Sequence, residues 1–252
     1  TLVFHQEFHG IRQLQQNSDE TFLVQDPVTE EHISALDVSA PPLTVYLAKR
    51  TRRLAYKLKE NYKIFLTTGA TEATMRLRLK NLDFADGYIL EHGGRILDTE
   101  FREDPRWAQL FAPYLDTLQE IRHKLEAADW RIVDAGRKTF FQIKAFENPH
   151  RTESEFQHLC ETLELPSGFE KTFNLGNLTI MPEPAGKGKA VAYYLRQHPE
   201  LSSHSIGIGD DLNDLEFLKI CQHAYVLGSA LPEVIQQAQK RGWYVSSKPH
   251  FQ

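Results

Sequence analysis

Cysteine is scarce in this sequence of 252 residues, which contains only Cys160 and Cys221. Two distant cysteines exclude a disulfide framework and lack the spacing of a metal site, so a reducing compartment is predicted and we expect a cytoplasmic protein. No apolar run reaches the length of about 18 residues that a membrane-spanning helix requires. No secretory signal is visible either. A membrane partner is therefore not expected.

A surplus of positive charge is also lacking. Lys and Arg together number 29 against 34 Asp and Glu, which gives a net charge of −5. The sequence thus has no electrostatic footprint for nucleic acid, and we expect no such partner. One basic cluster, Lys49–Arg53, lies on a predicted helix and is interpreted as a solvated face. The chain begins with Thr rather than Met, so a fragment of a larger protein is one expectation.

Short apolar runs predict buried strands, and amphipathic segments between them predict helices. This alternation favours an α/β protein with a parallel sheet, which binds ligands at the carboxyl ends of its strands. The middle of the chain has irregularly spaced glycines, prolines and aromatics, and we interpret it as an inserted α+β module. Strands are predicted at 22–24, 64–66, 88–90, 140–144, 174–181, 205–208 and 224–227, and helices at 43–58, 107–125 and 153–163.

The most informative stretch follows the predicted strand at 205–208. Asp210, Asp211, Asn213 and Asp214 place three carboxylates and an amide within five residues. Like charges packed so tightly at a strand end favour a bound divalent cation, and hard oxygen ligands suit Mg²⁺, which often pairs with substrate phosphates. The alternative is a solvated Asx-rich turn before a helix.

Three segments resemble motifs of haloacid dehalogenase-like (HAD) phosphatases. The stretch 209–214 looks like their fourth motif, GDxxND. Thr68-Gly69, after a predicted strand, looks like the second motif, and Lys187-Gly188, which opens a predicted helix, looks like the third. Residues 181–195 and 226–233 are similar to sucrose-phosphate phosphatases in particular. The resemblance covers roughly residues 21 to 246.

This resemblance implies a Rossmann-like α/β core with a parallel sheet and an inserted α/β cap of the C2 type. The core would comprise residues 1–85 and 185–252, and the cap residues 86–184. The implied reaction transfers a phosphoryl group from a phosphorylated sugar, such as sucrose 6-phosphate, to an aspartate with the help of Mg²⁺. In some sucrose-phosphate synthases a phosphatase-like domain follows a glycosyltransferase, so a glycosyltransferase domain or partner is a further expectation.

The resemblance also implies roles for single residues. Thr68 and Lys187 would bind the phosphate, while Asp211 and Asn213 would orient the loop. Simpler interpretations are a helix N-cap for Thr68 and a solvated lysine at a helix start for Lys187. A cation is unfavourable at the positive end of a helix dipole unless an anion lies nearby, which favours the phosphate site. Residues 91–94 (Glu-His-Gly-Gly) occupy the family's entry to the cap, and we interpret them as a turn.

The first motif of the family, which should read Asp-x-Asp-Gly-Thr, is degenerate here. Asp26 falls at the position of the nucleophile, although an ordinary turn residue is the alternative. Mg²⁺ would be held by Asp26, by the backbone carbonyl of Val28, and by Asp210 and Asp214. Val28 itself replaces the aspartate that acts as general acid and base, a role worth about 10²–10⁴-fold in rate.

Three hypotheses follow from this departure. The first is a sucrose-phosphate phosphatase-like domain that is catalytically impaired or inactive, which binds Mg²⁺ and a phosphorylated sugar or serves as a regulatory or assembly domain. The second is an active Mg²⁺-dependent sugar-phosphate phosphatase, in which Glu30 or Glu91 replaces the missing acid. The third is an interaction module that has lost ligand binding as well.

Overall fold

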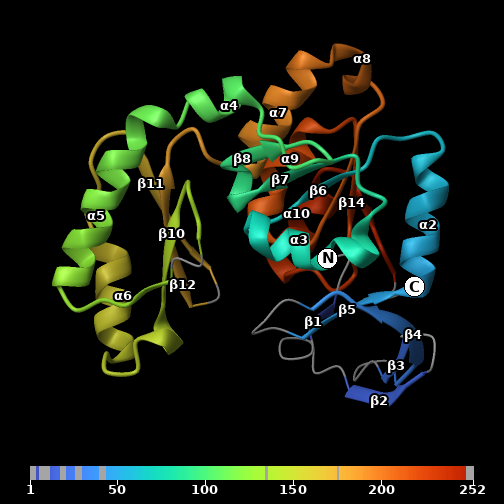
Figure 1. Cartoon of the computed structure of the whole chain (residues 1–252), viewed down its shortest axis with the longest axis horizontal. Coiled ribbons are helices and arrows are strands. Elements are labelled where there is room, and N and C mark those ends of the chain that lie inside the picture. The colour runs from blue at the N-terminus through green and yellow to red at the C-terminus, as the bar shows by residue number, and fades with distance from the viewer. Residues whose placement is uncertain are drawn as a thin grey trace.

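The computed structural model describes residues 4–5, 12–17, 21–25, 30–39, 44–133, 136–174 and 176–247. Figure 1 shows a central α/β part, a module built around α5 and α6 on one side of it, and a small sheet below it. The predicted class, an α/β core with an α/β cap, is confirmed. None of the described helices is long and apolar enough to cross a membrane.

The central part contains two three-stranded sheets. In one, β6 (Phe65–Thr67) pairs parallel with β7 (Gly87–Leu90), which pairs antiparallel with β8 (Arg95–Leu97). In the other, β13 (Ile206–Gly209), β14 (His223–Val226) and β15 (Tyr244–Val245) are parallel. The strands predicted at 64–66, 88–90, 205–208 and 224–227 are thus confirmed to within a residue or two.

Helices connect and cover these sheets. The helix α7 (Lys187–Gln197) packs against β7 and against α9 (Leu215–Ile220), and so joins the two halves. The aromatic rings of Phe65 on β6 and Tyr194 on α7 also touch, with centroids 4.4 Å apart. The remaining helices of this part are α3 (Glu72–Leu82), α8 (Pro199–Ser202) and α10 (Pro232–Lys240).

The sheet of β13, β14 and β15 is packed on one face only by the described residues. Its buried face carries Ala224 and Val226 against Leu218 of α9 and Val234 of α10. On the other face the side chains alternate outward, so that Ile206 and Ile208 are 40% and 51% exposed. The tyrosines of β14 and β15, Tyr225 and Tyr244, lie on this face as well, with ring centroids 5.4 Å apart.

The N-terminal strands form a separate antiparallel sheet. Its order is β1-β5-β4-β3-β2, where the strands are β1 (Phe4–His5), β2 (Arg12–Gln16), β3 (Thr21–Gln25), β4 (His32–Asp37) and β5 (Val45–Ala48). The expectation that residues 22–24 belong to the parallel sheet was therefore wrong, because β3 pairs antiparallel with β2 and β4. Connections this short cannot provide the crossover of a dozen or more residues that parallel neighbours need.

The helix α2 (Lys49–Lys59) follows β5 directly and packs on β4 and β5. It begins six residues later than the predicted helix at 43–58. Leu54 and Leu58, which the helical spacing assigned to the core, are 47% and 46% exposed, whereas Ala55 is buried. The face of α2 that packs on the sheet is therefore not the face that the spacing of the leucines predicted.

The cap is an antiparallel sheet covered by two helices (Figure 1). The strand order is β11-β12-β10-β9, and α5 and α6 pack their apolar side chains, such as Leu118 and Phe156, on Ile143 and Ile180 of the sheet. The elements are α5 (Leu115–Ala127), β9 (Ile132–Val133), β10 (Phe141–Lys144), α6 (Glu153–Thr162), β11 (Phe169–Asn174) and β12 (Asn177–Pro182).

Two details at the start of the cap differ from the sequence-based expectation. The helix predicted at 107–125 is divided into α4 (Pro105–Gln109), a 3-10 turn at Ala112–Tyr114, and α5. Pro113 lies in this turn, and proline cannot supply the N–H that a continuous helix needs there. The boundary proposed at residue 86 falls just before β7, so residues 87–97 pair within the central sheet rather than the cap sheet.

Candidate active site

Lys187 is the first residue of α7, and its side chain is buried at the end of the helix where the amide dipoles are positive. Its Nζ donates to Asn213 Oδ1 at 2.7 Å and to Asp214 Oδ1 at 2.6 Å. The side chains of Lys187 and Asp214 are each only 9% exposed. An ammonium carries three donors, and the third finds no acceptor among the described residues. A buried cation at a helix N-terminus that still has one N–H group available is suited to binding an anion.

The loop after β13 holds this lysine in place. Asp214 Oδ2 accepts the backbone N–H groups of Asp210 and Asp211 at 3.1 and 3.3 Å, so both of its oxygens are engaged by protein donors. Asp211 Oδ1 accepts the N–H of Leu212, and its Oδ2 accepts the side-chain amide of Asn213. These contacts fit the loop-orienting role expected of Asp211 and Asn213, and they extend that role to Asp214.

Thr68 lies in the turn directly after β6, and its carbonyl oxygen accepts the N–H of His92. Its N–H donates to Ile89 O, and its Oγ1 accepts the N–H of Ala70 at 3.1 Å. The alternative that Thr68 is a helix N-cap is wrong, because α3 is capped by Thr71, whose Oγ1 accepts the N–H of Thr74. The hydrogen bond to Ile89 therefore holds the turn that carries Thr68 against β7. The Thr68 hydroxyl is oriented by the backbone N–H of Ala70 within this turn, and it caps no helix.

A short 3-10 turn, η1 (Glu91–Gly93), closes the site from the side of β7. Its three residues have φ values of 53°, 54° and 93°, all in the left-handed region. A Cβ at Gly93 would clash with the carbonyl oxygen of Gly186 and the backbone nitrogen of Lys187. Only glycine permits this approach, so Gly93 allows the turn to touch the beginning of α7.

The neighbouring histidine was not recognised from the sequence. The ring of His92 lies so close to Gly69 that a Cβ there would clash with its Nε2, and His92 N–H donates to Thr68 O. Burial, together with the positive charges of Lys187 and Arg137, lowers the pKa of His92 to about 4. His92 is therefore neutral near pH 7. The Gly-Gly pair after a predicted strand was the one signal that the backbone here is unusual.

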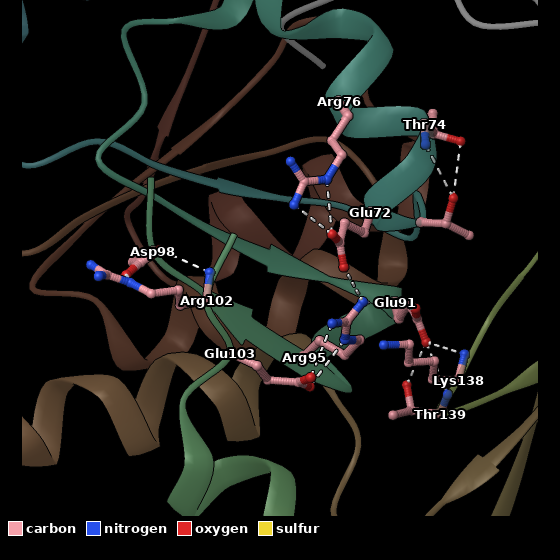
Figure 2. Close-up of polar contacts among 11 residues, drawn as sticks. Glu72, Thr74, Arg76, Glu91, Arg95, Asp98, Arg102, Glu103, Lys138 and Thr139 are labelled. Carbon is pink, nitrogen blue, oxygen red and sulfur yellow. Dashed lines mark hydrogen bonds and ion pairs between the residues drawn. The ribbon is translucent and has the colours of Figure 1, made fainter. Parts of the chain in front are cut away.

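Glu91 is fully buried and is held by the segment that leads into β10 (Figure 2). Its Oε2 accepts the N–H groups of Lys138 and Thr139 at 2.8 and 2.9 Å and the hydroxyl of Thr139 at 2.9 Å. Its other oxygen lies 3.9 Å from Arg95, which also pairs with Glu72 and Glu103. Among the described residues this other oxygen accepts no hydrogen bond, but the full burial of Glu91 and the three donors on Oε2 argue against its replacing a missing acid. Glu91 instead connects the core to the cap.

The described residues do not by themselves make a magnesium site. Asp26 and Val28, which were expected to supply a carboxylate and a carbonyl, lie outside the described residues. Asp214 and Asp211 use both oxygens on protein donors, and Asp210, another expected ligand, directly follows β13 in the same loop. In the part of the chain that is described, no three His, Cys, Asp or Glu side chains are grouped so that they could hold a metal ion.

Comparison with solved structures supports the fold. The chain resembles the sucrose-phosphatase from Synechocystis sp. PCC6803, whose structure contains sucrose and phosphate, with 20% identity and a TM-score of 0.62 over 79% of this chain and 84% of that one. It also resembles a haloacid dehalogenase-like hydrolase from B. subtilis, with 12% identity and a TM-score of 0.57 over 75% and 86% of the two chains. It further resembles a phosphatase from Bacteroides thetaiotaomicron, with 17% identity and a TM-score of 0.51 over 79% of this chain and 82% of that one.

A comparison with curated protein sequences finds no match. The sequence profile of the haloacid dehalogenase-like hydrolases matches residues 112–244, which is just over half of the chain and includes Lys187 and the loop around Asp214. The resemblance proposed from the three motifs is thereby confirmed. The chain belongs to the haloacid dehalogenase-like hydrolase family.

Proposed function

We propose that this chain binds a phosphorylated sugar, such as sucrose 6-phosphate, in the site around Lys187, and that its hydrolytic step is impaired. The proposed binding is supported by the buried ammonium of Lys187. Two of its N–H groups donate to Asn213 and Asp214, and the third has no acceptor among the described residues. Burying a charge costs several kcal/mol unless partners compensate. A phosphate dianion would engage the third donor and complement the helix dipole.

The impairment rests on the sequence of the first motif. Val28 cannot donate or accept a proton, and a sugar alkoxide is a poor leaving group without an acid. The loss of general acid–base assistance would slow hydrolysis by about 10²–10⁴-fold. The contacts of Glu91 support this proposal, because that carboxylate is bound to Lys138 and Thr139. Magnesium dependence and a glycosyltransferase partner stay predictions, since they derive from the family resemblance alone.

The test measures phosphate release and binding on the same proteins. Sucrose 6-phosphate is offered to the parent, to Val28→Asp and to Val28→Asn, with and without Mg²⁺, and its affinity is measured by calorimetry. We expect the parent to bind and to turn over slowly, Val28→Asp to gain at least about tenfold in rate, and Val28→Asn, which lacks a titratable group, to gain nothing. A parent that does not bind sucrose 6-phosphate contradicts the proposal.

A second candidate is an active phosphatase. The observation that favours it is the complete set of contacts among Lys187, Asn213 and Asp214, which is the arrangement a working phosphate site would use. The same assay separates the two functions. Rapid turnover by the parent that disappears in Asp26→Asn would establish hydrolysis and would overturn the impaired step.

A further inference from the structure

The parallel sheet of β13, β14 and β15 has an open face that is built of large apolar side chains. In the register of the three strands Ile208 is paired with Tyr225, and Tyr225 is paired with Tyr244, so these side chains form a continuous row across the sheet. Ile206 lies on the same face of β13, two residues before Ile208. The exposed fractions of the four side chains are between 40% and 58%. The open face is therefore one contiguous apolar patch.

Such a patch is unusual on parallel strands. Sheets of parallel strands occur almost only where both of their faces are covered. Here α9 and α10 cover one face, on which Ala224 and Val226 are buried. The other face leaves its apolar row in contact with water, and a contiguous exposed apolar patch marks a site of interaction rather than ordinary surface.

The helix α2 carries a second exposed apolar stripe. Leu54 and Leu58 are four positions apart, so they are neighbours on the helix surface, and their exposed fractions are 47% and 46%. The other side of this helix is already engaged, because Ala55 is buried and Arg52 pairs with Asp83 at the end of α3 at 2.9 Å. The two leucines are therefore held on the outer side of α2, where they are available to another molecule.

The same outer side of α2 is strongly basic. The eleven residues of the helix include six Lys or Arg and no Asp or Glu, although the whole chain has a net charge of −5. Arg50, Arg53 and Lys57 are exposed, and their spacing of three and four positions places them in a stripe beside Leu54. The rest of the molecule is thus more acidic than the net charge indicates, and it attracts the α2 helix of another copy.

We propose that two copies of this chain associate, with the leucine stripe of α2 from each copy packed on the open face of the β13-β14-β15 sheet of the other. One chain supplies both faces, so a two-fold axis makes the two contacts equivalent and closes the assembly as a dimer. The helix of the second copy then provides the layer that parallel strands need on this side.

This dimer is independent of the proposed function, since it uses neither Lys187 nor the loop around Asp214. Figure 1 shows α2 on the opposite side of the central part from the cap helices α5 and α6. A second copy that covers α2 therefore need not touch the cap of the same copy.

The experiment measures the mass of the full chain in solution by light scattering after gel filtration, and the dissociation constant of the dimer by sedimentation equilibrium. Two variants change one face each. Leu54→Gln keeps a residue with high helix propensity, and Ile208→Thr keeps the branched β-carbon that suits a strand. The matched control is Leu77→Gln on α3, which changes a leucine that is 63% exposed and lies outside both faces. Thermal unfolding of each variant checks that the fold is kept.

We expect the parent to have twice the mass of one chain. Leu54→Gln and Ile208→Thr should each weaken dimerisation by about tenfold or more, because a symmetric dimer loses the apolar contact twice. Leu77→Gln should stay within about twofold of the parent. A parent that is still monomeric at about 100 μM overturns the inference. Dissociation by only one of the two variants also overturns it, because the dimer would then pair one of the faces with itself.

A mixture of the two variants tests the pairing directly. The mixed dimer keeps one intact contact, which places α2 of the Ile208→Thr copy on the sheet of the Leu54→Gln copy. Its other contact contains both substitutions, whose effects are less than additive because they remove the same packing. The mixture should therefore contain more dimer than either variant alone at the same total concentration. An equal or smaller amount of dimer would overturn the assignment of α2 to the sheet.

Discussion

Replacement of Asp214 by alanine is expected to destabilise the protein strongly. The substitution leaves the ammonium of Lys187 buried beside Asn213 alone, and it removes the acceptor of the N–H groups of Asp210 and Asp211. Removing one partner of a buried ion pair costs about 3–5 kcal/mol. For a chain of this size, about 2–4 °C per kcal/mol corresponds to a decrease in Tm of about 6–20 °C.

The measurement is urea and thermal unfolding of Asp214→Ala, Lys187→Met and the double variant. Lys187→Met should cost less, about 2–3 kcal/mol, because the remaining carboxylate keeps two amide donors. The double variant should lose less than the sum of the single losses, since both remove the same contact. Glu126→Ala, which breaks the exposed pair with Arg122 on α5, is the control and should cost under about 0.5 kcal/mol. A cost below about 1 kcal/mol for Asp214→Ala, or strictly additive effects, would refute this account of the site.

Three further predictions concern buried or partly buried groups. Glu91→Ala should lower the free energy of unfolding by about 3–5 kcal/mol in urea titrations, since it strands the N–H groups of Lys138 and Thr139; an effect no larger than that of Glu126→Ala would contradict the role given to this carboxylate. Because the folded pKa of His92 is about 4 and its unfolded value is near 6.5, the unfolded chain binds more protons between these limits, so stability should fall as the pH decreases from 6.5 towards 4. In His92→Phe the dependence of the unfolding free energy on pH should be flatter in this window, and an unchanged slope would show that His92 does not titrate as described. Burial raises the pKa of the Cys221 thiol to about 11, so iodoacetamide at pH 8 should modify it much more slowly in the folded protein than in urea, and equal rates would contradict its burial.

The parts of the fold that follow local patterns were predictable from the sequence. An apolar run that ends at a glycine or a turn marks β6 and β13, and the predicted motif residues lie directly after these strands. Lys187 was predicted to open a helix and does so in α7. Because strand, turn and helix are consecutive in each motif, no knowledge of distant contacts was needed to find them.

The features that depend on distant residues were not predictable. The acceptor role of Glu91 depends on donors 47 and 48 positions further along the chain. The left-handed backbone of Glu91 and His92 was signalled only by the Gly-Gly pair that follows, since most non-glycine residues avoid this conformation. The pairing of β3 was assigned incorrectly because an isolated apolar run does not indicate which strands will lie beside it. The sequence therefore located the motifs but not the junction between core and cap.

The packing of α7 has a consequence for how the molecule can change over time. The elements against which it packs most, β7, η1, α8, α9 and the 3-10 turn at Leu212–Asp214, all follow residue 86 in the sequence. Among the described residues, this helix is therefore supported mainly by elements that follow residue 86, together with Phe65 of β6. A substitution in the N-terminal sheet is therefore expected to leave the described contacts of Lys187 with Asn213 and Asp214 in place.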